Sequence, residues 1–319
     1  MNDLATSSLS PRVAAPFARA VGVMAALGLL VAAPLFVGQY GMSVAFNLFQ
    51  SIALAESWLL ISGLTGYISL GHAVFVGLGS YVMAVCFAFI PFWAVIPLGG
   101  VAAGALALVL GYPALRVRGP YFVILTFGIA ELAKFVVVTI ESAVGNFGRI
   151  LIDVPDINVL YELMFGIAVL AFVLVSIVQR SRFGVALRAI REDETAAETI
   201  GINVRLAKVS AFALSGIIPG MVGAVMAMRS AYFEPMVAFS PMVSFAIVTT
   251  AMIGGSDTPL GPLLGAVLLV GASELLQAQA PEIYQIILGV VLVVFVLRVP
   301  EGIHSRMVSW IKRREPPRR

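Results

Sequence analysis

The stretch GYISLGHAVFVGLGSYVMAV, residues 66–85, has the composition of a membrane-spanning helix but contains residues that interrupt one. Most of it is apolar, yet glycines recur at Gly71, Gly77 and Gly79, and His72 stands where the apolar run begins. Glycine lets membrane helices pack closely. It also permits a helix to break where the backbone is buried in protein or lines a wet cavity. The stretch therefore predicts either a membrane helix with an irregular start or a helix packed closely through its small residues.

The rest of the chain has the same apolar character. Hydrophobic residues make up 60% and charged residues 12% of its 319 residues, and the mean hydropathy is +1.02. A soluble domain usually carries about 25% charged residues. The pI near 9.2 would suit a nucleic-acid-binding protein, but the basic residues gather at the ends of apolar segments, as in membrane proteins. The composition therefore predicts a polytopic membrane protein and no nucleic-acid partner.

The apolar segments suggest about ten membrane crossings. A spanning helix needs about 20 apolar residues, and only helices suit runs of this length. The eighth segment is short, so it either begins earlier, near Tyr232, or is a broken or re-entrant piece. The candidate segments are 20–37, 42–60, 68–90, 93–112, 120–140, 160–178, 208–228, 242–254, 260–277 and 283–298. We expect an all-α fold with about ten transmembrane segments, some of them broken or re-entrant.

The basic residues predict how the chain is oriented. With ten crossings, 17 of the 20 Lys and Arg residues fall on one side of the membrane. The positive-inside rule makes that side cytoplasmic, together with both termini. We therefore divide the chain into a cytoplasmic N-terminal segment (1–19), one transmembrane domain (20–298) and a basic cytoplasmic tail (299–319).

The cytoplasmic loop 180–208 contains a predicted pair of short helices. Phe183, Leu187 and Ile190 lie at helical spacing and form one apolar stripe. After this stripe comes Asp193, which precedes a second helical segment. An acidic residue is favoured at a helix N-terminus, so Asp193 marks the start of a second helix.

The second short helix is predicted to begin at Asp193 and Glu194. Ala196 and Ala197, with Ile200, form its small apolar face. Gly201 stands where a glycine commonly closes a helix. Such a pair of amphipathic helices suits docking into a groove of another protein, with register set by the charges of Arg188, Arg191 and Glu194. The alternative is a basic amphipathic segment lying on lipid headgroups.

Two charged residues stand inside the predicted span 120–140. Glu131 and Lys134 are three residues apart, so they can face each other along a helix. Charges inside a span are costly and commonly functional. The pair either supports a bundle-facing surface or lies on the path of a zwitterionic substrate. We also place Gly66, Ser69 and His72 on a candidate translocation path, although His72 also fits a structural, hydrogen-bonded role.

The longest predicted external loop, 141–159, contains Glu141, Asp153 and Asp156. It is either an ordinary solvated loop or a docking surface for an external partner.

Motifs for catalysis and for ATP binding are missing from the sequence. It contains no Gly-x4-Gly-Lys-Ser/Thr phosphate loop, no Gly-x-Ser-x-Gly and no His-Glu-x-x-His. A single cysteine and two distant histidines make no recognisable metal site. We therefore expect a protein that is not an enzyme, binds no metal or other cofactor, and relies on a separate polypeptide if ATP drives it.

Four stretches together resemble the LivM/LivH family, the membrane permeases of ABC importers for branched-chain amino acids. These are GLTGYISLGHAVFVGLGSY (63–81), RGPYFVILTFGIAEL (118–132), RSRFGVALRAIREDETAAETIGINV (180–204) and IGGSDTPLGPLLGA (253–266). They occur in the family's order and are distributed over most of the range 60–300, and 118–132 resembles the LivM branch in particular.

The resemblance implies that the loop 180–208 holds the coupling helix that fits a groove on the ATPase subunit. The family motif of Glu-Ala-Ala, three residues and Gly is here Glu194-Thr195-Ala196-Ala197, three residues and Gly201. The later Ile-x-Leu-Pro piece of the motif is not present at its usual spacing. The residues that the loop would use for coupling are Phe183, Leu187, Arg188, Arg191, Glu194, Ala196, Ala197 and Gly201.

The resemblance also implies partners and a location. The partners are a homologous LivH-like permease, two ABC ATPases that use ATP, a periplasmic substrate-binding protein and the lipid bilayer of the bacterial inner membrane. Leucine, isoleucine and valine are the first substrates to expect; related permeases carry urea, short amides and other amino acids. A different class, an ion-coupled secondary transporter, would use an intramembrane carboxylate such as Glu131.

Overall fold

The computed structural model describes residues 38–145 and 148–279, which are mostly helical. The long helices follow the apolar runs, and the short ones are separated by glycine, proline or a capping side chain. In chain order the elements are α2 (Gln39–Trp58), the π-helix η2 (Leu59–Gly63), α3 (His72–Cys86), α4 (Phe92–Ala114), α5 (Pro120–Val144), β1 (Arg149–Ile150), α6 (Ile157–Arg180), α7 (Arg182–Glu192), α8 (Glu194–Thr199), α9 (Val204–Ser230), β2 (Tyr232–Phe233), α10 (Pro235–Ala238), α11 (Pro241–Gly254) and α12 (Leu260–Gln279).

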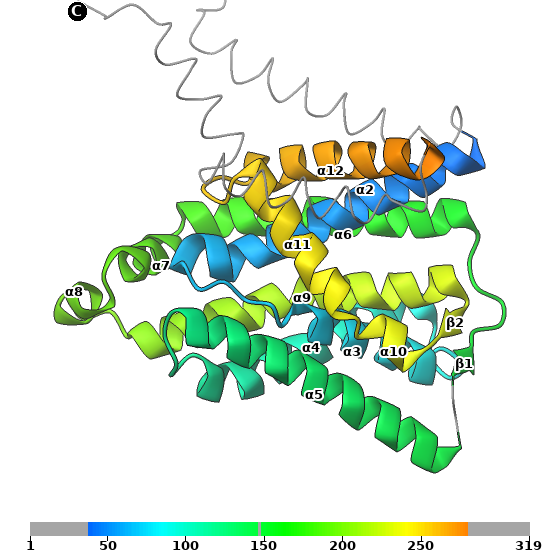
Figure 1. Cartoon of the computed structure of the whole chain (residues 1–319), viewed down its shortest axis with the longest axis horizontal. Helices are drawn as coiled ribbons and strands as arrows, with labels where there is room; N and C mark the ends of the chain where they lie inside the picture. Colours follow the sequence, from blue (N-terminus) through cyan, green and yellow to red (C-terminus); the bar gives the residue numbers. More distant parts are fainter. Residues whose placement is uncertain (1–37, 146–147, 280–319) are drawn as a thin grey trace, which may run out of the picture.

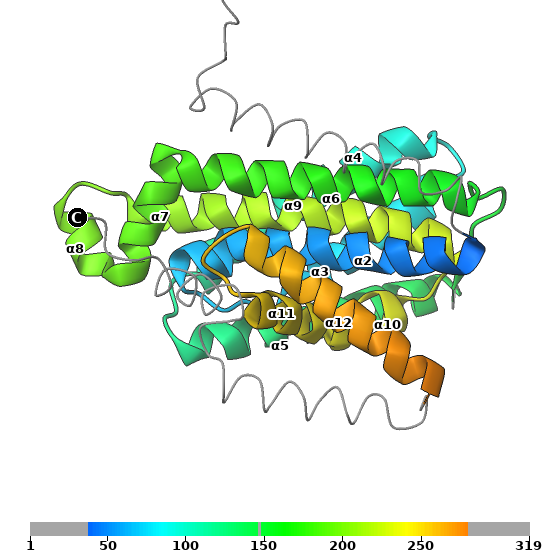
Figure 2. The same ribbon diagram turned by 90° about the horizontal axis from the view of Figure 1, so that it is seen from above.

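The long helices run side by side and give the molecule two distinct ends. α2, α6 and α9 lie alongside one another, as Figure 2 shows from above. The helix pair α7–α8 projects at one end, and the two-stranded antiparallel pairing of β1 with β2 lies at the other (Figure 1). We call these the α8 end and the β end of the bundle.

α9 is the central helix of the bundle and packs against α3 and α4. In the most apolar stretch of 18 consecutive residues of α9, 72% of the residues are buried, whereas in the corresponding stretch of α5 the share is 11%. Glycines make this packing possible, because an added Cβ at Gly79 of α3 would overlap the carbonyl oxygen of Gly220 in α9. Gly223 of α9 approaches Val76 of α3 in the same way. Small residues at such crossings let membrane helices approach closely.

The helices agree with most of the predicted membrane segments. Among the described residues, six helices are long and apolar enough to cross a membrane, and the apolar helices His72–Cys86 and Leu260–Leu276 are shorter. All of these lie at predicted segments. The predicted segments 20–37 and 283–298, like the terminal regions 1–19 and 299–319, lie outside the described residues. The structure is thus mostly helical, as a polytopic membrane protein requires, while the number of about ten crossings stays a prediction.

The eighth predicted segment begins earlier than 242 and is broken. α10 starts at Pro235 and α11 at Pro241, and together Pro235–Gly254 are long enough to span. Proline favours a helix start because it has no N–H to lose there. Phe239 fills the break and is 2% exposed, with its ring against Gly77 of α3. Both alternatives for this segment therefore hold: it begins before residue 242, and it is broken.

Candidate functional site

The two short helices of the loop 180–208 form where the sequence predicts them, because each is capped. The Ser181 hydroxyl accepts a hydrogen bond from the Gly184 N–H at 3.2 Å at the start of α7. The Asp193 carboxylate accepts from the N–H groups of Thr195 (2.8 Å) and Ala196 (3.1 Å) at the start of α8. These side chains satisfy helix N–H groups that have no partner within the helix.

Gly201 ends α8 as predicted. Its φ of +88° is a left-handed conformation that glycine adopts without strain. The Gly201 N–H donates to the Glu198 carbonyl at 3.0 Å, and the Ile202 N–H donates to the Ala197 carbonyl at 3.1 Å. This pair of bonds is a Schellman cap, which satisfies the last carbonyls of a helix.

The apolar stripe of α7 packs inward. Leu187 and Ile190 are 0% and 2% exposed, and Phe183 is partly buried against the same core. In α8, Ala197 is buried, but Ala196 is exposed and Ile200 is 73% exposed. The predicted small apolar face of α8 is therefore divided between the protein interior and the surface.

Glu194 is the centre of an ionic cluster between α8 and the rest of the protein. Its Oε1 accepts hydrogen bonds from the Tyr67 hydroxyl at 2.5 Å and from Lys208 Nζ at 2.8 Å, and its Oε2 lies 3.0 Å from Arg118 Nη2. The side chains of Glu194 and Lys208 are 12% and 5% exposed. The cluster links α8, α9, the start of α5 and the segment before α3.

The cluster favours the ionised form of Glu194. Burial alone raises the pKa of this carboxyl, but the hydrogen bonds from Lys208 and Tyr67 outweigh it and hold the pKa below its ordinary value. Burial and the neighbouring Glu194 raise the pKa of the Tyr67 hydroxyl, so Tyr67 stays a neutral donor.

Arg191 ties α7 to two other interrupted stretches. Its Nη1 donates to the Gly63 carbonyl at 2.8 Å and to Asp257 Oδ1 at 3.2 Å. Gly63 belongs to η2, and Asp257 belongs to the Gly- and Pro-interrupted run between α11 and α12. Two of the three charges predicted to set register with a partner, Arg191 and Glu194, thus make contacts within the chain, whereas Arg188 is exposed.

The segment between η2 and α3 is irregular, as the sequence predicts for the start of the third span. Gly66 has a φ of +76°, and a Cβ there would lie 3.3 Å from Cγ of Arg191. Side chains satisfy the freed backbone groups. The Ser69 N–H donates to Ser62 Oγ at 3.2 Å, the Leu70 N–H donates to Thr126 Oγ1 at 3.1 Å, and Trp58 Nε1 donates to the Ser69 carbonyl at 2.9 Å. Irregular backbone at membrane depth requires such partners.

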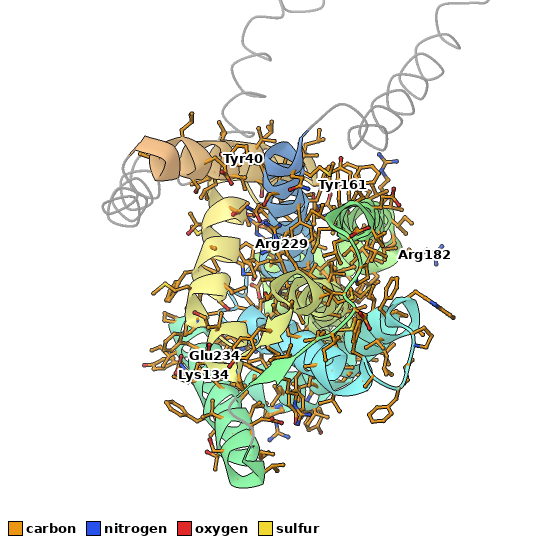
Figure 3. The ribbon with its side chains drawn as sticks, turned by 90° about the vertical axis from the view of Figure 1, so that its right-hand side faces the viewer. Tyr40, Lys134, Tyr161, Arg182, Arg229 and Glu234 are labelled. Atoms are coloured by element: carbon orange, nitrogen blue, oxygen red, sulfur yellow. The ribbon has the colours of Figure 1, made fainter. Side chains whose placement is uncertain are left out.

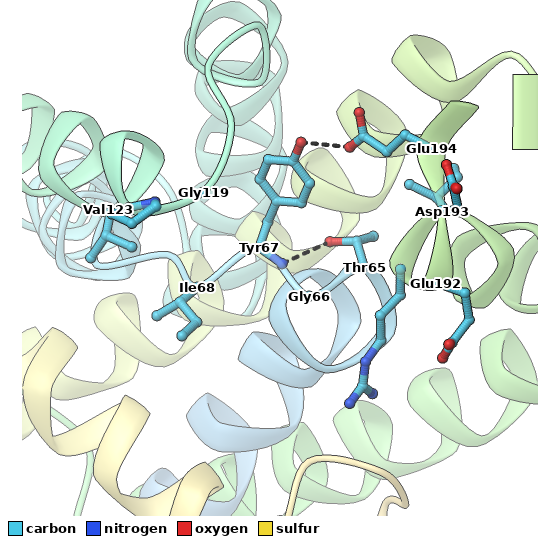
Figure 4. Close-up of a pocket in the computed structure, with 12 residues that line it drawn as sticks. Thr65, Gly66, Tyr67, Ile68, Gly119, Val123, Glu192, Asp193 and Glu194 are labelled. Carbon is cyan, nitrogen blue, oxygen red and sulfur yellow. Dashed lines mark hydrogen bonds between the residues drawn. The ribbon is translucent and has the colours of Figure 1, made fainter. Parts of the chain in front are cut away.

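A cavity of about 510 Å³ lies between this irregular segment and the helix pair (Figure 4). Its lining includes Gly66, Tyr67, Pro120, Arg191, Asp193 and Glu194. The close-up shows Tyr67 reaching across to Glu194. The cavity therefore brings together the loop residues and Gly66, which the sequence assigned to two different predicted sites.

The other residues of the predicted translocation path do not line this cavity. Ser69 is buried and bonded as described above, and His72 is fully buried beside Phe75, with ring centroids 5.8 Å apart. Within the described residues the His72 ring nitrogens have no hydrogen-bond partner. Glu131 and Lys134 face each other along α5 at 2.5 Å, as their spacing predicts.

Glu141 is not part of a solvated external loop. It lies in the last turns of α5, is 3% exposed, and accepts hydrogen bonds from Arg149 Nη2 and the Tyr81 hydroxyl at 2.8 and 2.9 Å. The loop prediction was wrong at this residue because α5 continues to Val144. The hydrogen bond to Glu141 raises the pKa of Arg149. Through Glu141, Arg149 at the β end is linked to α5 and to Tyr81 of α3.

Sequence reasoning missed three members of the Glu194 cluster. Tyr67 stands between glycines, Arg118 lies in a predicted turn, and Lys208 begins an apolar span. The signal that points to Lys208 is a charge at the edge of a span, since such charges are usually paired. Nothing in the sequence pairs these residues with Glu194. Among the described residues, no group of three His, Cys, Asp or Glu side chains is arranged to hold a metal ion.

The sequence profile of the family described as "Branched-chain amino acid transport system / permease component" matches residues 42–296. The chain belongs to this permease family. It is 26% identical over 315 residues to the high-affinity branched-chain amino acid transport system permease protein LivM of Escherichia coli (strain K12), which covers 88% of this chain and 74% of that protein.

Two further permeases show the breadth of the family. The LivH permease of the E. coli branched-chain system is 23% identical over 82% of this chain and 95% of its own length. The nucleoside ABC transporter permease protein NupC of Lactococcus lactis is 32% identical over 34% of each chain. No solved structure matches the chain significantly. The family resemblance seen in the sequence is thus confirmed, and this family member is a multi-pass membrane permease.

Proposed function

We propose that this chain is one of two permease subunits of an ABC importer that moves branched-chain amino acids across the bacterial inner membrane. The observation that carries the proposal is the capped helix pair α7–α8, which projects from the bundle. Arg191 and Glu194 of this pair form hydrogen bonds with η2 and with the irregular segment before α3. Arg188, Ala196 and Ile200 are exposed, and we propose that an ATPase binds this surface.

The proposed coupling runs through two bonded side chains. An ATPase that pulls on α8 would move Glu194, and with it Tyr67, Lys208 and the start of α5 at Arg118. A movement of α7 would act through Arg191 on the carbonyl of Gly63 in η2. ATP binding by two partner ATPases supplies the free energy, because a substrate can shift the equilibrium only by its differential affinity for the two states.

α5 supports the proposal of a second, LivH-like permease. Only 11% of its most apolar residues are buried within this chain, yet it carries the Glu131–Lys134 pair near its middle. Charges at membrane depth face protein or water and not lipid. We therefore place the second subunit, and the pathway between the two, against α5. The β end would receive the periplasmic binding protein, with residues 148–156 and 231–240 nearest to it.

The related LivM and LivH permeases favour leucine, isoleucine and valine as substrates. Urea, short amides or other amino acids stay the alternative, since a nucleoside permease is also similar. An ion-coupled transporter is less well supported, because its candidate carboxylate, Glu131, already has Lys134 as a partner at 2.5 Å.

The experiment compares Ala196→Trp with Ala105→Trp, two exposed alanines, one on α8 and one in the middle of α4. Both variants are purified and reconstituted with the permease, ATPase and binding-protein partners. We expect Ala196→Trp to insert normally but to lose ATPase association and at least about tenfold of ATP-dependent leucine uptake, since a bulky side chain in a docking surface costs 1–3 kcal/mol or more, roughly. Ala105→Trp should keep its ATPase association, because no partner is placed against that position. Uptake by this chain alone, driven by an ion gradient, would contradict the proposal.

A further inference from the structure

Two arginine side chains share one tyrosine ring at the α8 end. The guanidinium carbon of Arg205, at the start of α9, lies 3.8 Å from the centroid of the Tyr112 ring, and that of Arg116, just after α4, lies 5.3 Å from it. Cation–π contacts of this kind hold a guanidinium in place while leaving its N–H donors free. Tyr112 thus brings two positive charges from different helices to one spot.

Neither arginine has a carboxylate partner among the described residues. In contrast, the neighbouring Arg118 and Lys208 are both paired with Glu194. All four cations line a recess of about 350 Å³, together with only two acidic residues, Glu194 and Glu198. Glu194 is already paired with two of the cations, Arg118 and Lys208. The part of the recess beside Arg116 and Arg205 therefore has a net positive charge, which favours binding of an anion.

The surroundings point to an anion that is attached to a lipid. Tyr112 is 52% exposed, and one turn back along α4 the apolar side chains of Leu108 and Val109 are 48% and 69% exposed. Leu206, beside Arg205, is 64% exposed. In a membrane these apolar surfaces meet acyl chains, and a tyrosine at a helix end marks the headgroup level. A phosphate at the recess would therefore stand directly above acyl chains running along α4.

We propose that Arg116 and Arg205, held on Tyr112, form a binding site for the phosphate of an anionic phospholipid. Arginine suits phosphate because its fork of N–H groups donates two parallel hydrogen bonds. Basic pockets beside membrane helices on the cytoplasmic side bind such headgroups. The site does not depend on the transport function proposed above. Only its assignment to the inner leaflet depends on the proposed orientation.

The test uses the purified full-length chain, delipidated and titrated with phosphatidylglycerol or phosphatidylcholine, with bound lipid counted by native mass spectrometry. We expect the protein to retain phosphatidylglycerol in preference to phosphatidylcholine, and Arg116→Gln/Arg205→Gln to weaken that binding at least about tenfold, because both guanidinium groups that donate to the phosphate are lost. The matched control is Arg180→Gln/Arg182→Gln, which removes the same charge from exposed positions at the same end of the bundle. The side chain of Arg182 extends outward in Figure 3.

A second variant keeps the test independent of misfolding. Glu198→Gln removes from the same recess a carboxylate that has no ion-pair partner within 38–145 and 148–279, so it should strengthen phosphatidylglycerol binding severalfold. Equal loss in the two double variants would overturn the site, because it would mean that only overall charge attracts the lipid. Displacement of the lipid by millimolar glycerol 3-phosphate or inorganic phosphate would show a soluble-phosphate site instead. No preference for the anionic lipid, combined with crosslinking of Arg116→Cys to an ATPase subunit, would assign the recess to a protein contact and also refute the proposal.

Discussion

Glu194 shows how one residue can serve both the fold and the proposed coupling. It is the first residue of α8, next to the capping Asp193, yet its side chain turns inward to Tyr67 and Lys208. A lysine that is 5% exposed would be costly to keep charged without a partner. The carboxylate offsets that cost, and in doing so it ties the exposed α8 to the irregular segment before α3.

Glu194→Gln tests this role through its dependence on pH. The pKa of Glu194 is lower in the folded protein than its ordinary value. Its carboxylate therefore contributes stability above the unfolded-state pKa, and this contribution is lost as the pH falls through the folded-state pKa. At neutral pH we expect the variant to be about 2 kcal/mol less stable, the usual size for a hydrogen bond to a charged group. Thermal unfolding in detergent across neutral to strongly acidic pH measures the difference.

The control for this prediction is Glu192→Gln, an exposed carboxylate two residues earlier. It should leave the unfolding temperature unchanged at every pH. If the gap between the wild type and Glu194→Gln stays constant into strong acid, the ionic cluster does not stabilise the fold in the way described.

At the scale of helices, the sequence predicts where an element lies better than how it meets its neighbours. Apolar runs and caps predicted α7, α8 and the long helices within a few residues, because these signals are local. The π-helix η2 and the break at Phe239 were not predicted in detail, since both depend on what packs against them. The contact of Arg191 with Gly63 joins residues 128 positions apart, and no spacing rule reaches that far.

The crossing of α3 and α9 gives a prediction about glycine. Gly79→Ala should lower the free energy of unfolding by about 1–3 kcal/mol, because the added methyl group would overlap the carbonyl oxygen of Gly220 and push two buried helices apart. Gly128→Ala is the matched control. Gly128 lies within α5 and has nothing within 4 Å of the added Cβ, so the change should be neutral or stabilising by about 0.5–1 kcal/mol.

Thermal unfolding of both glycine variants in detergent tests whether close packing explains Gly79. A large loss at Gly79 and none at Gly128 supports close packing as the role of Gly79. Equal effects at both positions would mean that the α3–α9 contact does not require glycine at position 79, because helix propensity alone favours alanine at both sites.

At the scale of the whole molecule, the two ends of the bundle differ in the chemistry they present. The α8 end carries the capped helix pair, the Glu194 cluster and the arginine pair on Tyr112. The β end carries the short pairing of β1 with β2, and the Glu141–Arg149 pair that fixes it to α5. Charge distribution predicted part of this asymmetry from sequence: of the four basic regions, the two within the described residues, 116–118 and 180–208, lie at the α8 end. The pairing of β1 with β2 could not be predicted, since each strand has only two residues.

The orientation of these ends is open to a direct test, because the sequence contains one cysteine, Cys86. In a Cys86→Ala background, Arg182→Cys places a thiol at the α8 end, and Ile152→Cys places one at the β end, where Ile152 is 73% exposed. The positive-inside rule predicts that a membrane-impermeant maleimide labels Ile152→Cys in spheroplasts but labels Arg182→Cys only in inside-out vesicles. The reverse pattern would put α7 and α8 outside the cell, where no ATP-driven subunit could reach them, and the proposed coupling would fail with it.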